Sequence, residues 1–229
     1  MIVGRGMIAH AFTAYDKDKE TVIFASGVSN SSEKESSCFE REKTLLKESI
    51  AAYPEAALVY FGTCSVDDKE LAKSAYVQHK IEMENIIRTY CKRYFIFRLT
   101  QVVGKSSSPT LINFFVQKIK SGESFIVWKN STRNIIDVDD VFKIANYLIK
   151  NNLYVNEITN IAAPFCLSIF KIVTIIEELA NKKGDFSIEE RGGSYKIDID
   201  KISPYFRDSG ISFFDDYSKI IIEKYFFKK

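Results

Sequence analysis

The hydrophobic pattern of the first half of the chain alternates between short apolar runs and longer segments with helical spacing. The apolar runs predict strands at residues 1–3, 21–25, 56–61 and 94–99, and the helical spacing predicts helices at residues 7–15, 40–53, 74–92 and 111–120. Strands that alternate with helices are typical of an α/β sheet whose strands are largely parallel. The run at 56–61 is apolar throughout, as expected of a strand that is buried on both faces.

The alternation becomes irregular after residue 122. The pattern predicts short strands at 125–129, 134–138 and 158–162, and helices at 141–150, 168–183 and 215–226. Polar segments at 29–37 and 105–109 predict loops beside the carboxyl edge of the sheet. The sequence thus predicts one α/β unit, formed by 1–122 with 132–163, and a small α+β lobe, formed by 123–131 with 164–229.

A glycine-rich turn separates the first predicted strand from the first predicted helix. The sequence GRGMIA at residues 4–9 fits G-x-G-x-x-A in the strand–turn–helix context that binds the diphosphate of a dinucleotide. Gly4 permits the turn, Gly6 lets the backbone approach an anion, and the Arg5 guanidinium suits phosphate oxygens. The alternative is an ordinary turn in which the glycines serve only the backbone geometry.

The segment after this turn is short for a dinucleotide fold. Only about 15 residues separate Gly6 from the strand at Val22, too few for a strand, a helix and another strand. The usual second and third strands, with the acidic residue that holds the adenosine ribose, are therefore predicted to be missing. Asp16, Asp18 and Glu20 are the acidic residues nearest to the expected place.

A hydroxyl, a phenol and an ammonium group follow in order near the third strand. Thr63 lies at the carboxyl end of that strand, and Tyr76 and Lys80 lie four residues apart, which places both on one helix face. An ammonium group near a phenol favours the phenolate, so such a tyrosine can exchange a proton with an alcohol or a carbonyl oxygen. The alternative is a surface helix on which a tyrosine and a lysine occur by chance.

Composition narrows the classes of partner. The 32 basic and 30 acidic residues are interspersed and give a net charge of +2, so no basic face suggests nucleic acid or a membrane surface. No apolar run is long enough to span a bilayer. The four cysteines lack paired spacing and there are two histidines, which predicts reduced thiols, a cytoplasmic protein and no metal site.

Several short motifs occur in a fixed order along nearly the whole chain. They are GRGMIA at 4–9, VIFASG at 22–27, FGTCSV at 61–66, Tyr76 with Lys80, FRLTQVVG at 97–104, RNIIDVDD at 133–140, RGG at 191–193 and DIDK at 198–201. In this order they resemble the extended short-chain dehydrogenase/reductase family of nucleotide-sugar epimerases, dehydratases and reductases. The resemblance implies a Rossmann-like domain with NAD or NADP, and a small lobe that binds a nucleotide-linked sugar.

The resemblance also implies roles for individual residues. Thr63, Tyr76 and Lys80 take the catalytic positions, with Tyr76 as the acid/base. The expected cofactor-binding residues are Gly4, Arg5, Gly6, Met7, Ile8, Ser26, Gly27, Lys80 and Gln101. The expected substrate-binding residues are Thr63, Cys64, Ser65, Gln101 and Arg191, and for Arg191 an exposed surface role is an equal alternative.

Departures from the family pattern favour one branch of its chemistry. Cys64 and Ser65 stand where the 4,6-dehydratases carry an acidic pair, which disfavours dehydration. The short first half is most similar to compact reductases of capsule and O-antigen sugar pathways. The expectation is therefore a reductase of an NDP-4-keto-6-deoxysugar for surface polysaccharide. The alternatives are an NDP-sugar epimerase with retained NAD, and a non-catalytic family member that acts as a partner subunit. The helix at 74–92 further implies a homodimer.

Overall fold

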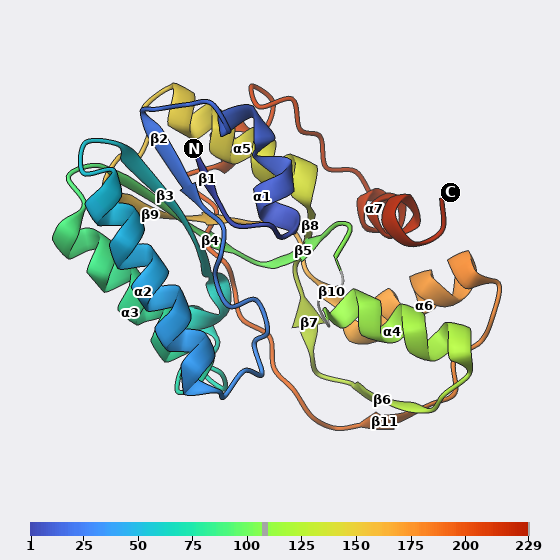
Figure 1. Ribbon diagram of the computed structural model, residues 1–229. Coiled ribbons are helices and arrows are strands. Elements are labelled where there is room, and N and C mark those ends of the chain that lie inside the picture. Colours follow the sequence, from blue (N-terminus) through green and yellow to red (C-terminus); the bar gives the residue numbers. More distant parts are fainter. Residues whose placement is uncertain (107–109, 229) are drawn as a thin grey trace.

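Five parallel strands form the main sheet of the computed structural model, which describes residues 1–106 and 110–228 (Figure 1). The order across the sheet is β1 (Ile2–Val3), β2 (Thr21–Phe24), β3 (Ala57–Thr63), β4 (Tyr94–Leu99) and β9 (Glu157–Ile161). Within the described residues β1 is the outer strand, with no strand beyond it. The α/β class and the shortened first half predicted from the sequence are therefore confirmed.

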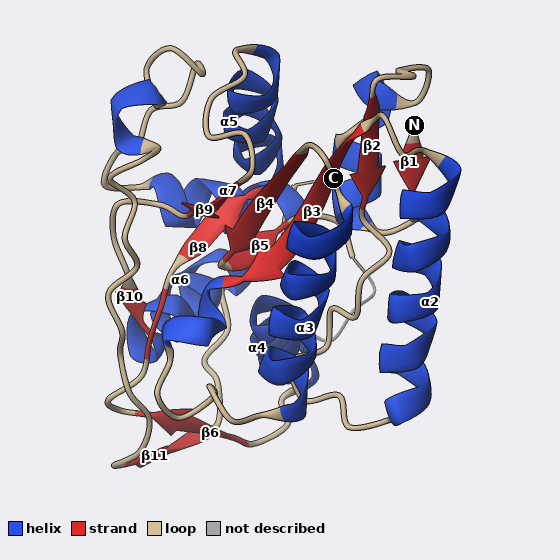
Figure 2. Cartoon of the chain, turned by 90° about the vertical axis from the view of Figure 1, so that its left-hand side faces the viewer, coloured by secondary structure: helices blue, strands red, loops and turns tan. Residues whose placement is uncertain are grey.

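Helices cover both faces of this sheet (Figures 1 and 2). On one face, α2 (Ser36–Ala52) and α3 (Ala75–Tyr90) bury Leu46, Met83 and Ile87 against β2, β3 and β4. On the other face lie α1 (Met7–Ala11) and α5 (Val138–Lys150), and Phe12 just after α1 and Val141 of α5 are buried against the same strands. The strand β3 is buried at all seven positions, as its continuous apolar run predicts.

The remaining elements form a second lobe with its own apolar core. They are α4 (Leu111–Ser121), β6 (Phe125–Trp128), β7 (Thr132–Arg133), β10 (Leu167–Ser168), α6 (Ile169–Ala180), β11 (Phe186–Glu189) and α7 (Tyr217–Phe226). The helix α4 begins at a Thr110 cap and ends at Gly122, whose φ of 78° is the left-handed conformation expected after a helix. Part of the predicted loop at 105–109, residues 107–109, lies outside the described residues.

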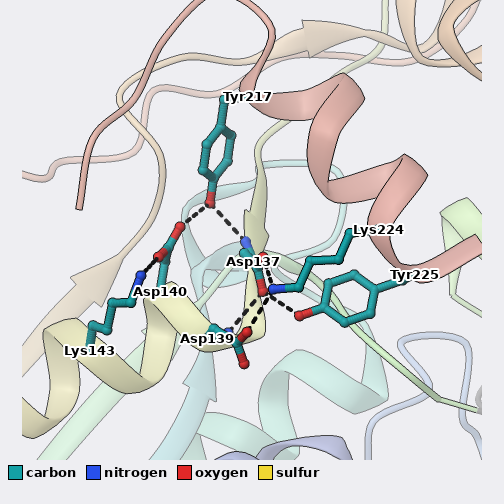
Figure 3. A network of polar contacts seen from close by, with 7 residues as sticks. All are labelled: Asp137, Asp139, Asp140, Lys143, Tyr217, Lys224 and Tyr225. Atoms are coloured by element: carbon teal, nitrogen blue, oxygen red, sulfur yellow. Dashed lines mark hydrogen bonds and ion pairs between the residues drawn. The ribbon is translucent and has the colours of Figure 1, made fainter. Parts of the chain in front are cut away.

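A short parallel pair links the lobe to the main sheet. The strand β5 (Gln101–Val103) pairs with β8 (Ile135–Asp137), and α7 docks where β8 turns into α5. Tyr217 accepts a hydrogen bond from the backbone N–H of Asp137 and donates to Asp140, both at 2.9 Å, and Lys224 donates to Asp137 at 2.8 Å (Figure 3). The last long helix therefore rests on the start of α5.

Several helices differ from the predicted bounds; α5, for example, begins at Val138 instead of residue 141. The predicted helix at 7–15 ends at Ala11 and continues as a 3₁₀ turn over Thr13–Tyr15, while α2 begins at Ser36 instead of residue 40. Ser36 and Ser37 have loop-like composition, but the helix that they start packs Cys38 and Phe39 against α3, and tertiary packing outweighs weak local propensity. No helix in the described part of the chain has the length and apolarity needed to cross a membrane.

Candidate active site

A cleft of about 1290 Å³ opens at the carboxyl ends of β1 to β4. The cleft is lined by the turns after β1 and β2, by Thr63 at the end of β3 and by Gln101 after β4. Arg133 and Tyr195 line it from the other side of the sheet edge, in β7 and in the segment after β11. The carboxyl edge of an open parallel sheet is where ligands of α/β proteins bind. The strand order thus brings the ends of four strands to one place.

The two glycines of the first turn have different surroundings. Gly4 has a φ of +140°, and a Cβ there would lie 2.3 Å from the carbonyl oxygen of Ala25, so the backbones of β1 and β2 require a glycine. A Cβ on Gly6 would meet nothing within 4 Å. Gly6 therefore leaves an open backbone face toward the cleft, which fits the close approach of a diphosphate.

Charged side chains make the cleft basic. Arg5, Arg41, Lys105 and Arg133 line it, and among its described lining residues Asp68 is the one acidic side chain. Such a lining suits a phosphorylated ligand. The acidic residues considered for the adenosine ribose lie elsewhere, because Asp18 sits before β2, where its carboxylate accepts the backbone N–H of Glu20 at 2.7 Å.

Thr63, Tyr76 and Lys80 lie together in this cleft. Thr63 is the last residue of β3, and Tyr76 is at the start of α3, where Ser74 caps the helix. The side chains of Thr63 and Tyr76 are hydrogen-bonded, and the Lys80 ammonium lies 5.9 Å from the centre of the Tyr76 ring. Burial raises the pKa of Tyr76 and the Thr63 hydrogen bond lowers it, with a net value of about 12. The phenol therefore holds its proton at neutral pH.

Lys80 also belongs to a buried ion pair that the sequence did not indicate. Its Nζ donates to Glu42 Oε1 at 3.0 Å and to the Tyr60 hydroxyl at 3.2 Å. Burial lowers the pKa of Lys80, although the Glu42 charge opposes that shift. Glu42 comes from α2, 38 residues before Lys80, so no local spacing connects the two residues.

The other predicted residues divide into two groups. Cleft-lining positions are held by Met7, Ile8, Ser26, Gly27, Ser65 and Gln101. Cys64 is fully buried, and its thiol donates to the carbonyl oxygen of Arg98 at 3.2 Å. Arg191 lies outside the lining, where it pairs with Glu189 at 3.3 Å and stacks over Trp128. The substrate-binding role of Cys64 and Arg191 stays a prediction.

Tyr195 is a cleft residue that the sequence analysis missed. It comes from the segment between β11 and α7, and its side chain is hydrogen-bonded to Ser65, two residues after Thr63. Burial is the main cause that raises its pKa to about 12. No periodic pattern marks this segment, so the sequence held no signal for the residue.

No cluster of three or more histidine, cysteine, aspartate or glutamate residues in the described chain could hold a metal ion.

Solved structures of nucleotide-sugar enzymes share this fold. The dTDP-glucose 4,6-dehydratase of Bacillus anthracis, in complex with NAD, superposes with a TM-score of 0.70 and 15% identity over 95% of this chain and 76% of that chain. The UDP-glucose 4-epimerase of Thermotoga maritima gives 0.71 and 16% over 96% and 81%. A dTDP-4-dehydrorhamnose reductase of Clostridium acetobutylicum gives 0.58 and 16% over 80% and 70%.

The sequence itself matches one family. No curated protein shows significant similarity to the chain. The family model described as "NAD dependent epimerase/dehydratase family" matches residues 22–162, which hold β2 to β9 with Thr63, Tyr76 and Lys80. This match confirms the family predicted from the motifs, and the chain belongs to the NAD-dependent epimerase/dehydratase family.

Proposed function

We propose that the chain is an NAD(P)H-dependent oxidoreductase that reduces the 4-keto group of an NDP-4-keto-6-deoxysugar. The observation that carries the proposal is the buried, protonated Tyr76 phenol. It is hydrogen-bonded to Thr63 and lies one helical turn from Lys80. These groups meet at the cleft edge that also holds the glycine turn. Membership in the NAD-dependent family supports the choice of cofactor.

The reaction balances with the groups that the cleft provides. NADH or NADPH, when bound, supplies a hydride to the carbonyl carbon. Tyr76 donates its proton to the carbonyl oxygen, Thr63 hydrogen-bonds the same oxygen, and the Tyr76 phenolate regains a proton from water. Lys80 would hold a ribose hydroxyl of the bound cofactor with the donor that Glu42 and Tyr60 do not use. The product is the alcohol at carbon 4.

Two features favour reduction over dehydration. Dehydration needs an acid and a base beside the hydroxyl threonine, and the two residues after Thr63 are a buried thiol and a serine. The Tyr76 phenol carries a proton, which is the state that a proton donor to a ketone requires. Among the proteins of similar fold, the reductase acts on a dTDP-linked ketosugar, which supports this substrate class. The product would supply a deoxysugar for surface polysaccharide.

The test follows absorbance of the reduced cofactor at 340 nm with dTDP- and UDP-linked 4-keto-6-deoxyglucose. We expect stoichiometric loss of NADH or NADPH, and the NMR spectrum of the product should show an NDP-6-deoxysugar with a hydroxyl group at carbon 4. With an NDP-hexose that carries a hydroxyl at carbon 4 as substrate, inversion at that carbon without net consumption of cofactor would identify an epimerase with retained NAD. A folded protein that binds neither NADH nor NADPH would be a non-catalytic family member, suited to act as a partner subunit.

A further inference from the structure

The Glu42 carboxylate makes four polar contacts beneath the cleft. Its side chain is fully buried, although burial of an unpaired carboxylate is strongly unfavourable. Oε1 accepts from the Tyr60 hydroxyl at 2.8 Å and from Lys80 at 3.0 Å. Oε2 accepts from the Val28 backbone N–H at 2.6 Å and contacts His79 Nε2 at 2.9 Å. The carboxylate thus joins α2 to β3, to α3 and to the loop after β2.

This network lies directly under the cleft. Gly27 and Lys80 both line the cleft, and a Cβ on Gly27 would come within 2.6 Å of Lys80 Nζ and 2.9 Å of Glu42 Oε1. The Gly27 backbone therefore covers the ion pair. An ammonium group has three N–H donors, and within the described residues Glu42 and Tyr60 take two of them. One donor remains for a hydroxyl group that enters the cleft.

We propose that Glu42 is a positioning residue for the proton donor of this site. Its carboxylate fixes the Lys80 ammonium beneath Gly27 and balances its charge, so that the Tyr76 phenol is kept as the acid that reduction requires. The Lys80 ammonium lies 5.9 Å from the centre of the Tyr76 ring, and without the Glu42 charge it would favour the phenolate. The inference rests on the proposed function and adds to it a residue that lies outside the cleft lining.

Charges around the phenol agree with this arrangement. The Glu42 charge raises the pKa of Tyr76, in addition to the larger effect of burial. Burial raises the pKa of Glu42, but His79, Lys80, Val28 and Tyr60 outweigh burial and lower it to about 2. The Glu42 carboxylate is therefore ionised over the whole physiological range. The titratable or charged groups in the surrounding elements are His79, Lys80 and Glu84 on α3, Glu42 and Cys38 on α2, Tyr60 on β3, Arg98 on β4, and Asp68 and Tyr195 at the cleft.

The experiment combines Glu42→Gln and Lys80→Met in a double-mutant cycle. NADH and NADPH affinities are measured by fluorescence titration of the wild type, both single variants and the double variant. We expect each single variant to lose about tenfold or more in affinity, and the double variant to bind as Lys80→Met does. Glu40→Gln, on the exposed side of the same helix, is the matched control and should bind as the wild type does.

A pH profile separates positioning from a purely structural role. With dTDP-4-keto-6-deoxyglucose as substrate, loss of the Glu42 charge should move the basic limb of kcat to lower pH by about one unit, because the phenol then loses its proton more readily. An unchanged limb in Glu42→Gln, or an independent further loss of affinity in the double variant, would overturn the inference alone. Wild-type protein that binds neither cofactor would overturn the proposed function as well.

The double variant also covers the case in which Glu42→Gln does not fold. Glu42→Gln leaves a buried ammonium without its partner, whereas the double variant leaves no unpaired charge in the pair. If the single variant aggregates, the comparison of the double variant with Lys80→Met still decides the question. Equal cofactor affinities support the inference, and a weaker double variant contradicts it.

Discussion

Gly4 and Gly6 stand two positions apart but are needed for different reasons. Gly4→Ala should destabilise the fold by roughly 1–3 kcal/mol, because its φ of +140° and the 2.3 Å approach to the Ala25 carbonyl leave no room for a Cβ. Gly6→Ala should leave stability nearly unchanged and weaken NADH and NADPH binding about tenfold, because its Cβ would occupy only the cleft. Urea unfolding and fluorescence titration measure the two effects, and the opposite pattern would contradict the assignment.

Glu42 should also dominate the acid sensitivity of the protein. Its folded pKa is about 2 against an ordinary 4.5, so its stabilising contribution is present above pH 4.5 and is lost as the pH falls toward 2. The difference corresponds to about 3 kcal/mol. Urea unfolding at pH 5, 4 and 3 should give a steeper loss of stability in the wild type than in Glu42→Gln. Parallel slopes would show that the carboxylate is not paired in solution.

Tyr76→Phe removes the proposed proton donor with little change in shape. We expect kcat to fall by about 10²–10⁴-fold, while cofactor affinity stays within a few-fold of the wild type. Tyr90→Phe on the same helix is the control, because Tyr90 is 67% exposed and far along α3 from the cleft. Turnover retained in Tyr76→Phe would assign the proton transfer to another group.

Local spacing accounts for which site residues the sequence could predict. Tyr76 and Lys80 are found from one helical turn, and Gly4 and Gly6 from one strand–turn–helix. Glu42 looks like a solvent-exposed residue of a polar helix, since its partners lie 14 to 38 residues away. His79 is likewise buried against this carboxylate, 37 residues away in the sequence. Non-local pairs of charges leave no periodic signal in one sequence.

At the scale of the elements, the helix α7 is held to the start of α5 by the hydrogen bonds of Tyr217. Tyr217→Phe leaves the N–H of Asp137 without its acceptor and removes the donor to Asp140, so we expect a loss of about 1–3 kcal/mol in unfolding free energy (Figure 3). Tyr53→Phe, at an exposed tyrosine after α2, should have no measurable effect. Equal stability of Tyr217→Phe and the wild type in urea would show that the hydroxyl is dispensable.

Segments with strong hydrophobic periodicity were predicted as helices or strands, whereas short strands that form only by pairing were not. The strand β4 has the predicted bounds of 94–99, because its apolar run is flanked by polar residues. The strand β5 was not predicted, because three residues carry no period and their conformation depends on pairing with β8 some 34 residues later. Because Gln101 belongs to β5, its place in the cleft could be inferred only from the family resemblance.

At the scale of the whole molecule, the predicted homodimer needs a surface for a second copy. Ile86 and Ile87 of α3 are buried in the chain's own core. The exposed stripe of the helix therefore consists mainly of polar residues such as Gln78 and Asn85, with Tyr90 exposed at its end. If this stripe forms the interface, Asn85→Arg should convert a dimer into a monomer. Light scattering at micromolar concentration measures the mass, and a wild-type mass of 26.2 kDa would contradict the prediction.

The outer position of β1 has a consequence for folding. The strand has two residues and one neighbour, and its ladder bonds to β2 join Met1 to Ile23 and Val3 to Ala25. An edge so short should fray before the rest of the sheet, and its amides should exchange with solvent sooner. A dinucleotide bound to the glycine turn that follows β1 would contact this edge strand and the rest of the sheet at once, and so reduce its fraying. Cofactor binding would then stabilise the edge of the sheet and the native state together, and the binding energy would compensate for the two strands that the described residues lack.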